Sequence, residues 1–392
     1  MDKKAFTHPS GDIQPLIGGG FAFIPNKLPP EKLDMNALIS PVGAALKALG
    51  ELQGAARRLS NPWLLIQPMQ RLEALTTSAM EGTYTTIDEL ALEEAQVGGG
   101  SADAREVLNF IRALDHANRR MDEGMPVTRR ILCEAHEIML RNTGAGRGAN
   151  RLPGQYKRAQ NMIGGHDLVT ARYVPPTPDA TPELMAEFER FINERDRKED
   201  ASGALIDLAL MHYQFEAIHP FADGNGRMGR MMITLLAKSW GLVDDLLLYV
   251  SPEIEARKDA YIDLMFAVSS RSEWEAWISF FMKVTQDACG RIVQTIGRLV
   301  DLKASYRQRA QQAGRSVNLQ NVVDRLFLTP VVTAPKMSEH LGITYPAAQK
   351  ILQQLEKAGI LTRLPGTRPQ AWLAREILDL TRTVSSSEQH PE

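Results

Sequence analysis

Apolar residues recur every three or four positions along most of the chain, which is the spacing that builds amphipathic helices. A clear case covers residues 203–217, where one side of the predicted helix collects Leu205, Leu208, Ala209 and His212. Segments that alternate with period two are few, and runs of β-branched residues are short. The pattern therefore predicts a mostly α-helical protein.

Turn and capping residues divide this pattern into separate helices. Before residue 200 they are expected at about 35–90 with a break at Asn61-Pro62, at 103–140 with a break at 124–126, and at 181–194. The expected helix caps are Ser101, Thr128 and Thr181. The first 35 residues are rich in glycine and proline and predict an extended arm docked on the rest.

Residues 142–182 interrupt the helices with many glycines and prolines. Within them, residues 161–165 and 171–174 have the composition of two short strands around a turn, so a β-hairpin is expected. A loop of this length inside a compact domain is usually either functional or disordered.

The chain changes character from about residue 317. Helices are expected at 319–328, 336–341 and 345–358, followed by a wing that turns at Pro365-Gly366 and a short helix to about 383. This order predicts a winged helix-turn-helix. The predicted domains are an N-terminal helical region (1–105), a helical core (106–285), a helical linker (286–316), the winged helix-turn-helix (317–384) and a polar tail (385–392).

Composition and charge indicate the cellular compartment and the kinds of partner to expect. Cys133 and Cys289 are the two cysteines among 392 residues, too few for a disulfide framework and consistent with a reducing compartment. The N-terminus has no secretory pattern, and the longest apolar runs, such as 231–237, are too short to span a membrane. We therefore expect a cytoplasmic protein with no membrane partner. The net charge of −2 argues against a chain-wide nucleic-acid surface.

The segment from His219 to Arg230 concentrates the chemistry. A helix is expected to stop at Pro220, and a glycine-rich turn leads into the next helix. The backbone N–H groups of Gly224, Asn225 and Gly226 then lie at a helix N-terminus, where they favour an anion. The turn is therefore a predicted phosphate site.

The side chains around this turn fit the same chemistry. Arg227 and Arg230 are three residues apart, and two guanidiniums suit a polyphosphate. Asp223 offers the hard oxygen that Mg²⁺ prefers. His219 titrates near neutrality and is the candidate general base, and Phe221 is expected to plug the core beneath the turn.

The segment resembles the Fic family, whose motif is HPFx(D/E)GNGRxxR. The fixed positions are all matched, by His219, Pro220, Phe221, Asp223, Gly224, Asn225, Gly226, Arg227 and Arg230. The resemblance extends from about Phe21 to Val284. It implies transfer of AMP from ATP to a Ser, Thr or Tyr hydroxyl of a protein target, which can be the protein itself.

The resemblance also implies roles for the residues. His219 would take the hydroxyl proton, and Asp223 would hold Mg²⁺ against the phosphates. The anion hole would be formed by Asn225, Gly226 and Arg227, with Arg230 on the terminal phosphate and Gly224 among the phosphate-binding residues. Tyr261 would contact the nucleotide. The flap would position the target through Gln160, Asn161, Ile163 and Gly164.

An inhibitory motif of the family, (S/T)xxxE(G/N), is matched by Thr77 with Glu81-Gly82. A Glu81 carboxylate paired with Arg230 would occupy the guanidinium that the γ-phosphate needs. ATP would then bind with its α-phosphate misplaced for attack. The same glutamate would instead activate water for AMP removal in some relatives.

Three segments depart from the family pattern. Lys157 ends Gly-Gln-Tyr-Lys where relatives often have GxxR, Met162 replaces a frequent Trp, and Ala256 and Ala260 precede Tyr261 where NRxxYY is frequent. The last change leaves the base preference open, with ATP the expected substrate. Transfer of another nucleotide or a phosphoryl group is the closest alternative.

An alternative of another class is a DNA-binding regulator whose Fic core senses nucleotide. Residues 301–392 carry 12 Lys and Arg against 8 Asp and Glu, a net charge of +4. This mild excess leaves DNA binding through residues 317–384 open. A homodimer is also left open, because winged helices serve as dimer contacts as well.

Overall fold

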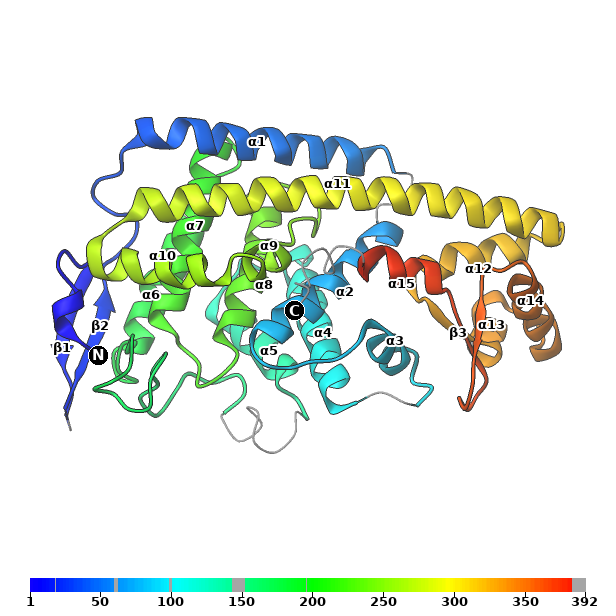
Figure 1. Ribbon diagram of the computed structural model, residues 1–392, viewed down its shortest axis with the longest axis horizontal. Helices are drawn as coiled ribbons and strands as arrows, with labels where there is room; N and C mark the ends of the chain where they lie inside the picture. Colours follow the sequence, from blue (N-terminus) through cyan, green and yellow to red (C-terminus); the bar gives the residue numbers. More distant parts are fainter. Residues whose placement is uncertain (18, 60–62, 99–100, 143–151, 195, 383–392) are drawn as a thin grey trace, which may run out of the picture. The chain divides into compact units, whose positions relative to one another are not determined.

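Figure 1 presents the computed structural model, which describes residues 1–392 except 18, 60–62, 99–100, 143–151, 195 and 383–392. The chain forms two compact units. Unit 1 contains Met1–Glu51 and Arg112–Cys289, and unit 2 contains Leu52–Ile111 and Gly290–Glu392. The predicted domains follow one another along the chain, whereas each unit combines separate stretches, because helices distant in sequence share a core.

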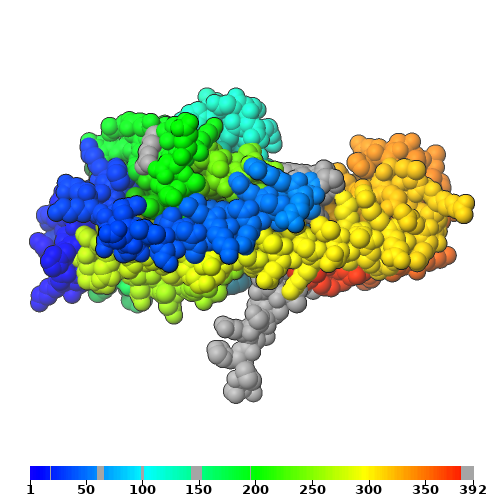
Figure 2. Space-filling model, turned by 90° about the horizontal axis from the view of Figure 1, so that it is seen from above, coloured from blue at the N-terminus to red at the C-terminus, as the bar shows by residue number. Residues whose placement is uncertain are grey.

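The elements of unit 1 are a 3₁₀ helix (Lys3–Ala5), β1 (Gly11–Pro15), β2 (Phe21–Pro25), α1 (Met35–Arg57), α5 (Arg129–Met139), α6 (Thr181–Glu194), α7 (Ala201–Ile218), α8 (Asn225–Ser239), α9 (Ser251–Glu255), α10 (Lys258–Arg271) and α11 (Trp274–Ala313). The division between the units falls inside α1, α4 and α11. Within unit 1, α1 runs beside the first part of α11, as Figures 1 and 2 both show.

Helix α7 forms the centre of unit 1. Every residue from Ala204 to Phe215 is buried, and the helix packs against α6, α8 and β2. A helix that is buried on all sides lies in the protein interior, and its one buried carboxylate in this stretch, Asp207, is paired with Arg197 at 2.7 Å. Trp277 of α11 is fully buried and donates its indole N–H to the backbone oxygen of Ala209 at 2.9 Å. Trp277 is therefore part of the core around α7.

The N-terminal arm is extended, as predicted, but it also contains a two-stranded antiparallel sheet. Strands β1 and β2 pair with Ile13 opposite Phe23. Phe23 is buried, and its N–H donates to the backbone oxygen of Val174 at 2.9 Å. The glycines and prolines of this region dominate its composition, so the short alternating run in β2 is not recognisable as a strand.

The predicted hairpin in residues 161–174 is reduced to one isolated antiparallel bridge, between Ile163 and Tyr173. Gly164 and Gly165 follow with φ of +63° and +138°, and this backbone turns away from the extended conformation. The segment, called the flap below (residues 158–175), is therefore a loop with a single paired position.

Unit 2 contains α2 (Trp63–Met80), α3 (Ile87–Ala95), α4 (Ala102–Asp122), α12 (Val317–Leu328), β3 (Val331–Thr333), α13 (Ala334–Leu341), α14 (Tyr345–Lys357), β4 (Thr362–Leu364), β5 (Ala371–Leu373) and α15 (Arg375–Arg382). The strands form an antiparallel sheet in the order β3-β5-β4. Residues 317–382 (the C-terminal module) thus have the element order expected for a winged helix-turn-helix. Strand β3 is too short for the sequence pattern to predict.

The helix caps follow the predictions in part. The Ser101 hydroxyl accepts the N–H of Ala104 at 3.0 Å, as expected at the start of α4. Thr128 makes no such bond; the carboxylate of Glu189 accepts the N–H of Arg129 at 2.8 Å instead. Thr181 lies inside α6 and donates its hydroxyl to the backbone oxygen of Thr177, so it is not the cap.

Two predicted features, the Asn61-Pro62 break and the polar tail, lie outside the described residues. None of the helices in the described part of the chain is both long and apolar enough to cross a membrane.

Candidate active site

The predicted phosphate turn joins α7 to α8 in unit 1. His219 follows the last residue of α7 and adopts a left-handed conformation, with φ of +50° and ψ of +61°. Its N–H donates to the backbone oxygen of Phe215 at 2.9 Å and closes the helix. Such a conformation is uncommon for a residue other than glycine, and it is found preferentially at functional sites.

The imidazole of His219 is one-fifth exposed. Its Nδ1 lies 3.3 Å from the backbone oxygen of Glu216. A carbonyl oxygen only accepts, so Nδ1 carries the proton in the neutral ring and Nε2 carries the lone pair. The side chain therefore has the tautomer that a general base needs at Nε2.

The side chain of Asn225 holds the turn closed. Its Oδ1 accepts the N–H of Phe221 and its Nδ2 donates to the backbone oxygen of Phe221, each at 2.8 Å. The contribution of Asn225 to an anion hole is therefore left to its backbone N–H. Phe221 itself is fully buried, which confirms that it plugs the core.

The start of α8 provides the predicted anion site. Gly224 is the N-cap with φ of +77°, and a Cβ there would lie 2.7 Å from Cε of Met139. Asn225, Gly226 and Arg227 occupy the first turn, where N–H groups have no acceptor within the helix. The turn thus combines a glycine at a position of positive φ with three N–H groups at a positive helix end.

Arg227 and Arg230 lie on the first turns of α8, and each is 2% exposed. A guanidinium buried to this degree needs an anionic or strongly polar partner. Two such cations beside a helix N-terminus suit a polyphosphate more than a single carboxylate.

Asp223 is the candidate magnesium ligand. It is partly exposed, and its Oδ1 accepts the N–H of Gly224 at 2.8 Å, which orients the carboxylate toward the start of α8. Among the described residues no three His, Cys, Asp or Glu side chains cluster to hold a metal by themselves. A single carboxylate fits Mg²⁺ that is bound together with substrate phosphates.

His136, from α5, is a part of the site that the sequence did not reveal. Its ring stacks on Phe221 with centroids 3.8 Å apart and an interplanar angle of 10°. Nδ1 accepts the N–H of Gly154 at 2.8 Å, so Nε2 carries the proton and donates to the backbone oxygen of Asp223 at 2.9 Å. Burial lowers the pKa of His136 to about 4, which keeps the ring neutral.

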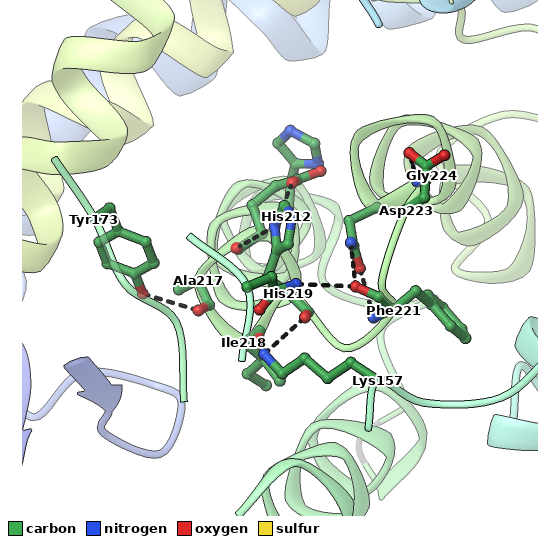
Figure 3. Close-up of polar contacts among 12 residues, drawn as sticks. Lys157, Tyr173, His212, Ala217, Ile218, His219, Phe221, Asp223 and Gly224 are labelled. Carbon is green, nitrogen blue, oxygen red and sulfur yellow. Dashed lines mark hydrogen bonds and ion pairs between the residues drawn. The ribbon is translucent and has the colours of Figure 1, made fainter. Parts of the chain in front are cut away.

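Lys157 holds the other end of the turn. Its ammonium donates to the backbone oxygens of Ile218 and His219 at 3.2 and 3.0 Å, and its N–H donates to the backbone oxygen of Pro220 at 2.8 Å (Figure 3). Burial lowers its pKa to about 7. The departure from arginine therefore places one compact amino group, rather than a forked guanidinium, at the C-terminal end of α7.

The flap is tied to the turn at its base. Gln160 donates to the backbone oxygen of Pro175 at 2.8 Å, and Asn161 donates to that of Phe221 at 3.1 Å. Tyr173 donates its hydroxyl to the backbone oxygen of Ala217 at 2.8 Å (Figure 3). Beyond these ties Ile163 is 37% exposed, and Gly164 is also exposed. The predicted flap residues thus divide into anchors, Gln160 and Asn161, and an exposed strand-like edge.

Tyr261 lies on α10 beside α7 and is 8% exposed. Its hydroxyl is 2.9 Å from Nε2 of His212, and its ring centroid is 5.9 Å from that of Trp277. These contacts place most of the side chain in the core. Its predicted contact with the nucleotide stays a prediction.

Glu81 belongs to unit 2 and Arg230 to unit 1. Glu81 directly follows α2, as predicted, and Gly82 follows it with φ of +84°. The N–H of Gly82 donates to Ala79 and that of Thr83 to Ser78, at 2.9 and 3.0 Å, which is the Schellman pattern of helix ends. The pairing of Glu81 with Arg230 stays a prediction.

Comparisons with known proteins agree with this geometry. The Fic/DOC family N-terminal model matches residues 39–119, and the Fic/DOC family model matches residues 126–237. A Fic family protein from Desulfovibrio desulfuricans G20 has the same fold, with a TM-score of 0.54 at 21% identity, over 88% of this chain and 98% of that one.

Curated relatives point the same way. Protein adenylyltransferase Fic of Drosophila ananassae is 32% identical over 164 residues, which are 41% of this chain and 30% of the relative. The protein of that name in Drosophila melanogaster is 29% identical over 196 residues, 49% of this chain and 36% of the relative. The chain thus spans about a third of the length of these relatives. With both family regions in order and the complete motif on the α7–α8 turn, the chain belongs to the Fic/DOC family.

Proposed function

We propose that the protein is a protein adenylyltransferase that transfers AMP from ATP to a Ser, Thr or Tyr hydroxyl of a protein. The observation that carries the proposal is the α7–α8 turn, where a histidine with its lone pair on Nε2 adjoins a helix N-terminus with two buried arginines. Relatives named protein adenylyltransferase support the class of reaction.

The transfer is a displacement at the α-phosphorus of ATP. The hydroxyl oxygen of the target forms a bond to this phosphorus, and the bond to the bridging oxygen of diphosphate breaks. Nε2 of His219 takes the hydroxyl proton. The N–H groups at the start of α8 and the side chains of Arg227 and Arg230 stabilise the charge on the phosphates.

Mg²⁺ would be held by Asp223, and when bound it would neutralise phosphate charge. The role of the chain is to orient that carboxylate through the N–H of Gly224 and to keep the turn closed through Asn225. The exposed edge at Ile163 would pair with the backbone of the target, which aligns a hydroxyl without reading its sequence.

The proposal includes a brake. The carboxylate of Glu81 would pair with the guanidinium of Arg230 and exclude the γ-phosphate from it. The Schellman end of α2 supports this role, because it fixes the backbone of Glu81 at a single position beyond the helix.

Intact-mass measurement of the purified protein with ATP and Mg²⁺ tests both parts. Glu81→Gly should gain the mass of one or more AMP groups, and the unmodified chain should gain much less. Glu81→Gly combined with His219→Ala should gain none, since a lost general base costs about 10²–10⁴-fold.

Each result has a distinct meaning. Equal labelling of the unmodified chain and of Glu81→Gly would contradict inhibition by Glu81. A mass gain of a phosphoryl group instead of AMP would identify phosphoryl transfer as the reaction. No labelling of Glu81→Gly, even with a cell extract as the source of targets, rejects adenylyl transfer and favours a regulator that senses nucleotide. Loss of AMP from pre-labelled protein only when Glu81 is present would instead identify AMP removal.

DNA binding stays a separate proposal for the C-terminal module. Lys350, Lys357, Arg363 and Arg368 are exposed on α14 and around the wing. Arg363 pairs with Glu356 at 3.2 Å, so this face carries mixed charge. A duplex-DNA titration of the full chain at several salt concentrations tests it, and a slope that does not change in Lys350→Ala with Arg368→Ala contradicts it.

A further inference from the structure

His136, a residue outside the family motif, contacts the buried side of the α7–α8 turn. His136 touches it through ring stacking on Phe221 and through a hydrogen bond to the backbone oxygen of Asp223. Its other nitrogen is occupied by the N–H of Gly154, so the tautomer is fixed. The imidazole is fully buried and connects three separate stretches of the chain.

These contacts involve Phe221 and Asp223, which precede the anion site at the start of α8. The bond to the oxygen of Asp223 sets the orientation of the peptide that leads into Gly224, whose N–H donates to the Asp223 carboxylate. Nε2 of His136 also lies 3.6 Å from where a Cβ on Gly224 would be, so the ring limits the space beneath the turn. A small rotation of this peptide would redirect the carboxylate and the first N–H groups of α8.

We propose that His136 is a positioning residue that orients the Asp223 carboxylate and the anion site for adenylyl transfer. The inference rests on the proposed function. His136 acts through its hydrogen bond to the backbone oxygen of Asp223. Loss of the bond from Nε2 should therefore reduce the rate of transfer more than a change in the size of the ring.

Variants in the Glu81→Gly background separate these contributions. His136→Gln keeps a donor near the position of Nε2, His136→Asn keeps an acceptor near Nδ1, and His136→Phe keeps the stacking alone. We expect kcat to fall at least about tenfold in the Phe and Asn variants and to recover substantially in Gln, at similar melting temperatures. Calorimetry should show weaker binding of ATP with Mg²⁺, and little change without Mg²⁺, in the Phe variant.

Equal kcat and equal Mg²⁺-dependent ATP binding in the Phe variant and its parent would overturn the inference. So would equal losses in the Gln and Asn variants. Failure of the Glu81→Gly parent to label any protein would count against the proposed function instead, and the binding measurement would still test His136.

A second inference comes from unit 2 alone. Helix α3 and the C-terminal module share one apolar core, which contains Ile87, Ala91, Ala95, Val97, Val331, Ala371, Leu373 and Leu378. Arg375 of α15 pairs with Asp88 of α3 at 2.9 Å, and the Lys336 ammonium donates to the backbone oxygen of Ala95. Helix α3 is therefore built into the C-terminal module, although more than 200 residues separate them in sequence.

Helix α2 is attached to the same body. Arg71 is 2% exposed, pairs with Glu94 of α3 at 2.8 Å and donates to the backbone oxygen of Leu328 at the end of α12. Helices α12 and α15 both pack against α2, and Figure 1 shows one end of α15 (red) next to it. A buried guanidinium that bridges three helices loses its partners if any of them moves.

Glu81 directly follows α2, the helix to which the C-terminal module is attached. Its backbone is fixed by the Schellman end of α2, and the next turn is fixed by a buried hydrogen bond of 2.9 Å from the Thr83 hydroxyl to Glu106 of α4. Both anchors belong to unit 2. The segment with the predicted inhibitory glutamate is therefore bracketed by contacts to one folded body.

We infer that the C-terminal module sets the position of Glu81 and is the input through which inhibition is released. This inference also rests on the proposed function. A ligand or partner that alters the packing of the module on α2 and α3 would displace the inhibitory carboxylate.

Arg71→Met and Lys336→Met, made in the full chain, loosen the attachment at two separate points. We expect each to raise labelling at least about threefold when Glu81 is present and to have no further effect in Glu81→Gly. Arg105→Met is the matched control, because Arg105 pairs with Glu93 of α3 at 3.1 Å but has no such bond to the C-terminal module in the described structure. It should leave labelling unchanged.

Hydrogen exchange gives a readout that does not depend on activity. The N–H groups of Gly82 and Thr83, which close the Schellman turn, should exchange faster in Arg71→Met and Lys336→Met than in Arg105→Met. Unchanged exchange and unchanged labelling in the first two variants would overturn the inference. Faster exchange together with no activation by Glu81→Gly would support the coupling of the C-terminal module to the Glu81 segment. It would reject inhibition by Glu81.

Discussion

The α7–α8 turn and the flap both belong to unit 1, but they are held in opposite ways. The turn is closed by side chains: two bonds from Asn225, one from His136 and two from Lys157, with Phe221 buried beneath. The flap is tied to the turn only at its base and has one backbone bridge at Ile163. Its far part is held from outside the turn, by the N-terminal amine of Met1 on the backbone oxygen of Val169 and by an ion pair of Arg172 with Asp263.

This difference matches two kinds of task. Under the proposed function, stabilising a transferring phosphoryl group requires donors fixed before the substrate arrives, so rigidity in the turn would contribute directly to rate. Aligning a protein chain requires an edge that accepts many sequences, and backbone pairing does so without side-chain contacts. Sensitivity to substitution should therefore be high in the turn and low in the flap.

The strongest test of rigidity is Asn225→Asp. The carboxylate still accepts the N–H of Phe221, but its second oxygen faces the backbone oxygen of Phe221 instead of donating to it. We expect kcat for adenylyl transfer to fall at least about tenfold. Asn161→Ala, which removes one bond to the same oxygen from the flap side, is the comparison and should cost less. Equal losses would show that turn and flap form one rigid unit.

His212, buried on α7, gives a test in which the free energy of unfolding depends on pH. Burial lowers the pKa of His212 from 6.5 to about 3, so the ring is neutral in the folded protein. The unfolded chain binds a proton there below about pH 6.5, and stability is therefore lost as the pH falls from 6.5 toward 3, by at most about 1.4 kcal/mol per unit. Urea unfolding between pH 7.5 and 4.5 measures this loss. A His212→Phe variant with an equally steep loss would contradict it.

Ile163→Pro tests the flap. Proline has no N–H, so the bond from Ile163 to the backbone oxygen of Tyr173, 2.8 Å long, is lost. We expect the KM for a protein target to rise about tenfold while the affinity for ATP stays the same. Ile163→Ala keeps the N–H and should behave like the parent; if it shares the defect, the side chain rather than the backbone recognises the target.

Tyr173→Phe should have the smallest effect. It removes one buried hydrogen bond to Ala217, worth about 1 kcal/mol of stability, and leaves the backbone bridge intact. Thermal unfolding should show the loss with little change in kcat or KM. A large rise in the KM for the target would mean that this anchor also sets the orientation of the flap.

The sequence predicted most helices because apolar spacing and capping residues are local signals. Helix α8 and its glycine N-cap follow from residues 219–230 alone, and so does the buried Phe221. His136 was missed because it lies 83 residues before His219 with no metal-ligand spacing. Its role depends on a stacking contact that only the folded chain creates.

Weak local signals explain the other differences. The N-terminal sheet and β3 are short strands, and short strands are stabilised by partners distant in sequence rather than by their own pattern. Sequence order suggested that residues 1–105 form one region. Packing assigns α2 and α3 to the body of the C-terminal module, and no periodicity could reveal that choice.

The Schellman turn at Gly82 concerns the last position of the inhibitory motif, which is G or N. The residue after the glutamate must adopt a left-handed backbone, and glycine and asparagine are the residues that tolerate it best. In this chain, the G or N of the motif therefore meets a conformational need of the turn that follows Glu81. A β-branched residue there would keep the glutamate in the sequence but would strain the turn that fixes its backbone.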